Sequence, residues 1–212
     1  ERLTVREKTR ARDKADVLVA LLEYWAKGYP CVRPVRIPSV ALLTATVAPH
    51  VAPGDALASA QLSFWIFGVD DLADERALSV GELERRAERW YAIARGEPDP
   101  PGEEDELSRM LREIRAALSR FRLFDRLCDH WAGEVRALVE AMIQEYRYGL
   151  AYGQAEAAGL PTLDQYVASG LHSIGVPLWG WAVWLATDDP SITSRLASLQ
   201  KATAHCSAAV RL

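Results

Sequence analysis

The chain has 212 residues, of which 50% are hydrophobic and 25% are charged, a composition typical of a globular protein with a core of its own. These values argue against a disordered chain, a fibre and a small disulfide scaffold. The 25 basic and 29 acidic side chains give a net charge of −4. Nucleic acids and anionic membranes are therefore not expected as general partners, because such binding depends on neutralising phosphates.

The cysteines and the N-terminus favour a reducing, cytoplasmic location. Cys31, Cys128 and Cys206 are scattered and odd in number, which indicates reduced thiols. The charged first residues do not resemble a signal peptide. The apolar stretch 171–187 is interrupted by a glycine and a proline, so we expect a kinked buried helix there and no membrane span.

The first third of the chain predicts three helices. Apolar residues recur at three- and four-residue steps in Val17, Leu18, Leu21, Leu22 and Trp25, which is one face of a helix. Prolines make 29–38 a connector, and a short helix follows over 39–50. A long helix is expected over 55–75, and its middle, 62–69, is apolar almost all round and should be deeply buried.

The remainder is also helical in pattern. Ser79-x-x-Glu82 and Thr162-x-x-Gln165 have the form of capping boxes, which start helices. The helices expected after the first of these cover 79–95, 106–121 and 124–152, and the second starts a helix that breaks at Gly175-x-Pro177. A helix resumes over 179–186, and Pro190 opens the last one. With no strand pattern, the sequence predicts a single all-α domain spanning 1–212.

Four acids within six residues form the most informative segment: Asp70, Asp71, Asp74 and Glu75. On a helix, Asp70 and Asp74 share a face, and their repulsion is relieved by a cation. Oxygen ligands from two carboxylates suit Mg²⁺. Asp71 is rotated away and suits a supporting role or a basic partner. A solvated helix end is the alternative, but the preceding buried run and the helix dipole both disfavour unpaired acids there.

These residues resemble the Asp-Asp-x-x-Asp motif of class I terpene synthases, present here as Asp70-Asp71-Leu72-Ala73-Asp74. The aromatic lead-in 64–67 is also similar, as are the helix started by Pro161-Thr162 and the break at 173–177. The similarity in helix order covers the whole chain. Chain-elongating prenyltransferases share the aspartate motif, whereas the motif followed by a kinked helix is more specific.

The resemblance implies a class I terpenoid synthase-like helical barrel that is a lyase, binding three Mg²⁺ ions and an isoprenoid diphosphate. It implies Asp70, Asp71, Asp74 and Glu75 as the metal-binding segment. The metal ions help the diphosphate leave, and the carbocation then cyclises in a dry, apolar cavity. A homodimer is a further expectation of the resemblance.

Helical spacing and the resemblance name further site residues. Ser63, Ile66 and Phe67 lie near the Asp70 face and are expected to look into the cavity. Trp181 and Trp184 share a face beyond the break, where aromatic rings can stabilise a cation. The resemblance carries over Gly175 as a catalytic position, since its carbonyl, freed by the break, can point at the forming cation. Core packing is the alternative for each aromatic residue.

The sequence departs from the family pattern in two places. The family's second metal motif (Asn/Asp, Ser/Thr and Glu at four-residue steps) would be expected to begin at about Arg211-Leu212 and to lie after Leu212, so we expect the chain as given to supply one wall of the metal site and to lack the C-terminal helices. The stretch 167–172 has no arginine, which resembles bacterial labdane-related diterpene synthases and favours a C20 diphosphate of geranylgeranyl or copalyl type. Arg147, Arg33 and Arg36 are the candidates for diphosphate contact, with surface ion pairs as the alternative.

Two other functions stay open at this point. A chain-elongating prenyltransferase would use the same magnesium chemistry, but it needs a second aspartate-rich motif and a basic patch, and neither is present in the sequence. A non-catalytic helical domain would bind an apolar ligand, with the acids as a solvated helix end.

Overall fold

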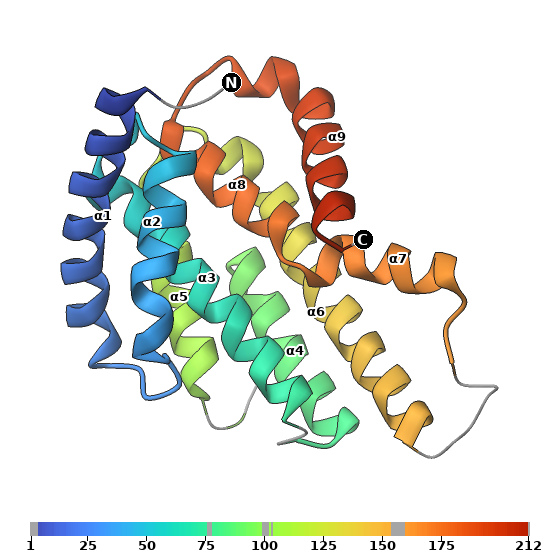
Figure 1. Ribbon diagram of the computed structural model, residues 1–212. Helices are drawn as coiled ribbons and strands as arrows, with labels where there is room; N and C mark the ends of the chain where they lie inside the picture. The colour runs from blue at the N-terminus through green and yellow to red at the C-terminus, as the bar shows by residue number, and fades with distance from the viewer. Residues whose placement is uncertain (1–3, 76–77, 99–101, 103, 154–159, 212) are drawn as a thin grey trace.

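The computed structural model describes residues 4–75, 78–98, 102, 104–153 and 160–211, and every regular element in these ranges is a helix (Figure 1), which confirms the predicted all-α class. The elements are α1 (Val5–Ala26), the 3₁₀ turn η1 (Pro34–Arg36), α2 (Ile37–Val47), α3 (Pro53–Asp74), α4 (Val80–Arg95), α5 (Glu106–Leu118), α6 (Phe124–Gly153), α7 (Leu163–Ser173), α8 (Val176–Thr187) and α9 (Ile192–Arg211).

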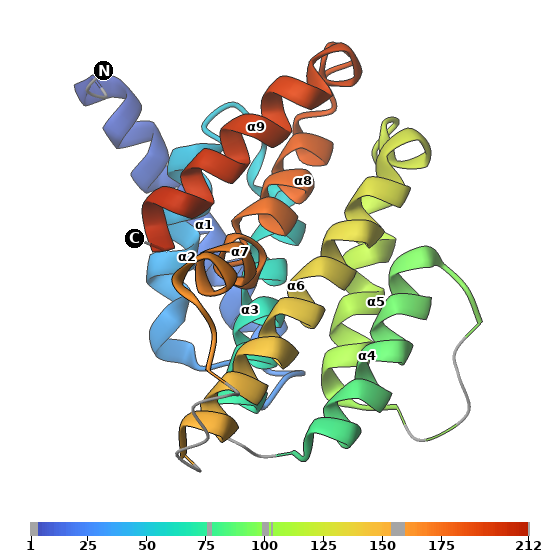
Figure 2. The ribbon, with the colours of Figure 1, turned by 90° about the vertical axis from the view of Figure 1, so that its right-hand side faces the viewer.

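Helix α3 is the centre of the molecule. It contacts α1 and α2 on one side, α5 and α6 on another, and α8 on a third. Figure 2 shows α4 and α5 on one flank of α3 and α6, with α8 and α9 on the other. Because α3 is surrounded, its direction is set by packing, and its C-terminal end is held at one rim of the bundle.

The predicted burial of the middle of α3 is confirmed. Leu62 and Trp65 are both 0% exposed, and the Trp65 indole donates a hydrogen bond to the Leu107 carbonyl (Nε1–O 3.1 Å). A Cβ at Gly68 would lie 2.5 Å from Leu107 Cδ2, so any larger residue there would force the Leu107 side chain of α5 to move. These contacts anchor the helix one turn before its acidic end.

Helix boundaries largely follow the sequence signals. Ser79 caps α4 by accepting a hydrogen bond from the Glu82 amide, and Thr162 and Gln165 form the complete capping box of α7. The predicted face of the first helix is right at Leu18 and Leu22 and wrong at Val17, which is 47% exposed. The buried face of this helix runs through Ala11, Ala15, Leu18 and Leu22, and Val17 is rotated about 100° from Leu18 around the helix axis.

The apolar stretch 171–187 is divided by the predicted break. Helix α7 ends at Ser173 and α8 begins at Val176, with Gly175 between them in the left-handed region (φ +75°). A Cβ at Gly175 would lie 2.9 Å from Ile66 Cγ2, so the backbone of the break rests directly against α3. None of the described helices has both the length and the apolar run needed to cross a bilayer.

Candidate active site

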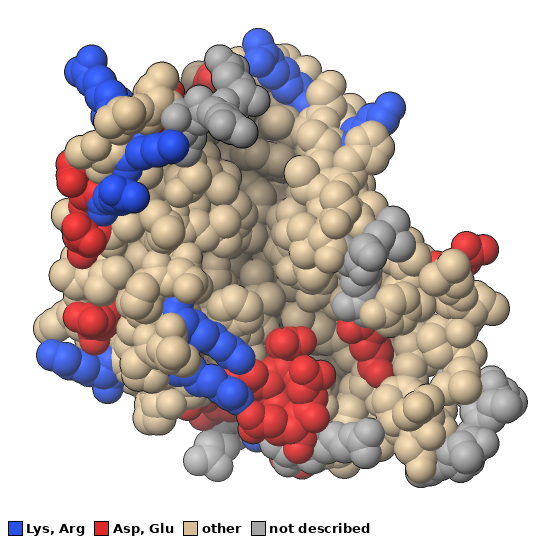
Figure 3. All heavy atoms as spheres, viewed as in Figure 1, with Lys and Arg blue, Asp and Glu red and all other residues tan. Residues whose placement is uncertain are grey.

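The acidic end of α3 lies at the rim of a hollow in the protein surface. Figure 3 shows acidic side chains gathered at the lower end of α3, basic side chains beside them, and a hollow above that is lined mostly by uncharged residues. An apolar concavity with charged groups at one edge is the usual form of a small-molecule site. The arrangement of the four acids determines what this edge can bind.

Asp70 and Asp74 face α6 across a small cavity of about 120 Å³. The side of α6 that lines it contributes Met142, Glu145 and Tyr146. Asp70 and Asp74 are one helical turn apart, as the spacing predicts. The structure therefore brings three carboxylates, two from α3 and one from α6, to one cavity.

The electrostatics of this cavity favour a bound cation. Burial, together with repulsion from Asp74, Asp71 and Glu145, raises the pKa of the Asp70 carboxyl to about 6. Such a carboxyl is held in an environment that disfavours its charged form. A cation between Asp70 and Asp74 would reverse this effect, because it stabilises the ionised carboxylates.

Asp71 points to a different set of partners. Arg36 donates two hydrogen bonds to its carboxylate (Nη1–Oδ2 2.9 Å and Nη2–Oδ1 3.0 Å), and Arg33 approaches the same group (Nε–Oδ2 3.1 Å). Arg33 also pairs with Glu75. Asp71 is therefore the partner of basic groups, which is the second of the two roles that its position on the helix suggests. Asp71 and Glu75, which also belong to the expected metal-binding segment, pair with arginines, whereas Asp70 and Asp74 line the cavity next to α6.

Arg36 also contacts an aromatic residue of α3. The Arg36 guanidinium lies over the Phe67 ring, 4.7 Å from its centroid, and Phe67 packs edge-on against Phe64. Ile66 is 7% and Ser63 8% exposed, while Phe67 is partly exposed. Of the three residues expected to line the cavity, Phe67 has the most surface available.

Gly175 lies against Ile66, as a cavity-floor position requires, but its carbonyl differs from expectation. The Gly175 oxygen accepts a hydrogen bond from the Trp179 amide (2.9 Å), so the break does not free it. Gly175 is the N-cap of α8, and its oxygen begins the hydrogen bonding of that helix. A carbonyl has two lone pairs, so one acceptor position remains on this oxygen.

Trp181, one of the residues expected to face the substrate, is almost fully buried. Trp181 is 1% exposed, stacked on His130 (centroids 5.0 Å apart) and edge-on to Trp184 (4.9 Å). The two tryptophans line a separate small cavity with His172 and Glu134. With its ring stacked on His130 and almost no surface exposed, Trp181 packs in the core of the bundle next to this cavity.

Arg147 does not line the acidic cavity. Its guanidinium pairs with Glu84 of α4, and both side chains are about half exposed. The surface ion pair, given above as the alternative, is therefore the contact that the structure contains.

A divalent cation fits the donor set of Asp70 and Asp74. Within the described residues, no three His, Cys, Asp or Glu side chains are grouped so as to hold a metal ion by themselves. Mg²⁺ is commonly held by one or two carboxylates, with water and substrate phosphate completing its shell. Two carboxylates at the mouth of a cavity match that pattern, and the raised pKa of Asp70 is consistent with it.

Glu145 is a site residue that the sequence reasoning missed. Its Oε1 accepts a hydrogen bond from Ser173 Oγ (2.8 Å), just before the α7–α8 break. Met142, Glu145, Tyr146 and Gly149 follow a three- and four-residue spacing and line the same cavity. This spacing marks one face of α6, but only the packed structure reveals that the face meets Asp70.

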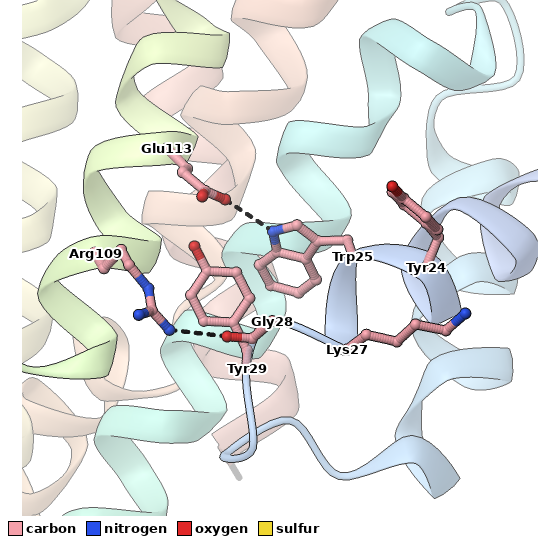
Figure 4. A pocket seen from close by; sticks show the side chains of 7 residues that line it. All are labelled: Tyr24, Trp25, Lys27, Gly28, Tyr29, Arg109 and Glu113. Atoms are coloured by element: carbon pink, nitrogen blue, oxygen red, sulfur yellow. Dashed lines mark hydrogen bonds between the residues drawn. The ribbon is translucent and has the colours of Figure 1, made fainter.

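A second, wider cavity of about 580 Å³ lies between the end of α1 and α5. Figure 4 shows two hydrogen bonds between its lining residues: the Trp25 indole donates to Glu113 (3.1 Å) and Arg109 donates to the Gly28 carbonyl (2.8 Å). Glu113 is the one acid among its lining residues, so this cavity lacks the carboxylate pair of the α3 site.

Comparison with known proteins identifies the family of the chain. A search of curated proteins gave no match. Residues 61–212 match the family model described as terpene synthase family 2, C-terminal metal binding, and this range includes the four acids, the face of α6 and the α7–α8 break. The match covers well over half of the chain and agrees with an all-helical bundle whose carboxylates border an apolar hollow. The chain belongs to terpene synthase family 2.

Proposed function

We propose that this chain forms the aspartate-bearing part of a class I terpene synthase active site, in which Asp70 and Asp74 bind Mg²⁺. The observation that carries the proposal is the division of the acids: Arg33 and Arg36 pair with Asp71 and Glu75, while Asp70 and Asp74 line a cavity together. Membership of a metal-binding terpene synthase family supports it.

When bound, Mg²⁺ would act as a Lewis acid toward the diphosphate of an isoprenoid substrate. The chain's own residues hold the carboxylates in position and keep water out of the site. Asp70 and Asp74 are fixed one turn apart by a helix whose preceding turns are buried, so the ligands need little reorganisation. Met142, on α6, supplies an apolar side to the same cavity.

The apolar wall is suited to a hydrocarbon chain and a carbocation. Phe67 is partly exposed near the acids, with Arg36 over one face of its ring, and Ile66 and Ser63 precede it on α3. Gly175 closes the floor against Ile66, and its carbonyl dipole is a further group that can stabilise positive charge. A dry wall matters because water would quench the cation.

The substrate that we propose is a C20 diphosphate of geranylgeranyl or copalyl type. Leu171 and His172 occupy the turn before the break, and neither the described α7 nor this turn contains an arginine. That absence is the feature shared with labdane-related diterpene synthases. We therefore expect turnover of a C20 substrate in preference to farnesyl diphosphate.

Metal binding is tested on the chain itself. Titration with Mn²⁺, followed by electron paramagnetic resonance, should give an affinity that falls at least about tenfold in Asp70→Asn and in Asp74→Asn. Asp55→Asn is the matched control, because Asp55 is an exposed acid at the opposite end of the same helix. Equal affinity in all three variants would refute the ligand assignment.

The reaction is tested with the complete protein, Mg²⁺ and farnesyl, geranylgeranyl or copalyl diphosphate, with products identified by mass spectrometry. A cyclic hydrocarbon or alcohol from a C20 substrate supports the proposal. A longer linear diphosphate formed only with isopentenyl diphosphate would identify a prenyltransferase instead. The absence of turnover in every mixture would favour a non-catalytic helical domain.

A further inference from the structure

The hydrogen bond between Ser173 and Glu145 connects two parts of the site that are far apart in sequence. Glu145 lies on α6 and lines the cavity of Asp70 and Asp74. Ser173 is the last residue of α7, is 8% exposed, and donates to Glu145 Oε1 at 2.8 Å. A partly buried hydrogen bond to a carboxylate is among the stronger ones, so it restrains both side chains.

The contacts beyond this bond form a closed path. Two residues after Ser173, Gly175 packs against Ile66 of α3, where a Cβ would be 2.9 Å from Ile66 Cγ2. Ile66 precedes Asp70 by one helical turn and shares its face. The path thus runs from Asp70 across the cavity to Glu145, through Ser173 and Gly175, and back to α3.

The charge of Glu145 also acts on the cation ligands. Glu145 is near enough to Asp70 that its charge helps to raise the pKa of that carboxyl. A cation held by Asp70 and Asp74 would attract Glu145 and change the balance of forces on its bond to Ser173. Cation binding and the position of the break therefore depend on the same carboxylate.

We propose that Glu145 is a positioning residue that couples cation binding at Asp70 and Asp74 to the geometry of the α7–α8 break, through its hydrogen bond with Ser173. This inference rests on the proposed metal site. It adds Glu145 to that site and states that cation binding there changes the geometry of the α7–α8 break. Glu145 acts through Ser173 on Gly175, which packs against Ile66 of α3.

The test compares two serines of α7 that both bond to α6. Ser173→Ala removes the bond to Glu145, while Ser169→Ala removes a bond to the Ala141 carbonyl (3.2 Å) that does not involve the acidic cavity. Hydrogen exchange of peptides covering 171–179 is measured with and without Mg²⁺, alongside Mn²⁺ affinity. The exchange of these amides reports the break directly, because the Gly175 and Trp179 amides are hydrogen-bonded across it.

We expect Mg²⁺ to slow exchange across 171–179 by about fivefold in the unmodified protein and in Ser169→Ala, and to have no such effect in Ser173→Ala. Glu145→Gln keeps an acceptor for Ser173 but not the charge, so it should preserve metal-free protection and lose the response to Mg²⁺. Glu145→Ala should lose both.

Three results would overturn the coupling: an unchanged Mg²⁺ response in Ser173→Ala, an equal loss in Ser169→Ala, or no response in the unmodified protein despite Mn²⁺ binding. Failure of the metal site itself looks different. In that case the unmodified protein binds Mn²⁺ no better than Asp70→Asn, and the coupling is overturned together with the site.

Discussion

Arg36 holds Asp71 through two hydrogen bonds of 2.9 and 3.0 Å, and its guanidinium lies over the ring of Phe67. One side chain from the connector between α1 and α2 therefore neutralises an acid of the α3 cluster and braces the adjacent aromatic residue. The acids of α3 are thereby divided into Asp71 and Glu75, which pair with arginines, and Asp70 and Asp74, which line a cavity.

The first prediction concerns this ion pair. The side chains of Arg36 and Asp71 are 29% and 21% exposed, so their interaction is less screened than that of a surface pair. A double-mutant cycle with Arg36→Gln and Asp71→Asn should give a coupling energy of about 1 kcal/mol in urea unfolding. The coupling should fall with added salt, and additive single effects would show that the pair does not contribute to folding.

The second prediction concerns Gly175. Alanine there must adopt φ +75° and place its Cβ 2.9 Å from Ile66 Cγ2, so Gly175→Ala should lower the free energy of unfolding by about 1–3 kcal/mol. Gly133→Ala is the control, because Gly133 lies inside α6 with nothing within 4 Å of a new Cβ. That substitution should be neutral or stabilise by up to about 1 kcal/mol. A neutral effect at Gly175 would contradict the tight contact of the break with α3.

The third prediction separates packing from substrate contact at the tryptophans. Trp181 is 1% exposed between His130 and Trp184, so Trp181→Ala should destabilise the fold by about 3–5 kcal/mol. Trp184 is less buried, and the same change there should cost less. Chemical unfolding followed by circular dichroism measures both. A fully stable Trp181→Ala variant with altered products would instead show that Trp181 contacts the substrate.

The fourth prediction concerns pH. The hydrogen bond with Glu134 (3.3 Å) raises the pKa of His172 above its ordinary value of 6.5, against the opposing effect of burial. Because the folded protein binds this proton more tightly than the unfolded chain, the stabilisation is complete below 6.5 and is lost as pH rises through the folded pKa.

Melting temperatures measured from pH 5.5 to pH 8.5 (about one unit below and two above the free pKa) test this. The advantage of the unmodified protein over His172→Gln should shrink as pH rises, and Glu134→Gln should remove most of that pH dependence. The effect should be small, because the imidazole is 44% exposed. An advantage that grows with pH would contradict the direction of the shift.

The family, the helices and the main site segment could be predicted from local signals. Capping residues located the starts of α4 and α7, and the apolar run of 62–69 predicted that α3 is central. The spacing of Asp70 and Asp74 predicted a shared face, and Gly175-x-Pro177 predicted the break. Each of these signals lies within a few residues of the feature it predicts.

The sequence by itself therefore determined an all-helical chain with a carboxylate pair after a buried helix. Only the tertiary structure decided which groups meet that pair, because helical periodicity defines a face relative to its own axis and not the helix that covers it. Arg36 and Asp71 are 35 residues apart, and Glu145 and Ser173 are 28 apart. Those contacts, and the enclosure of Trp181, result from how α3, α6 and α8 pack, a property of the whole core that no single segment encodes.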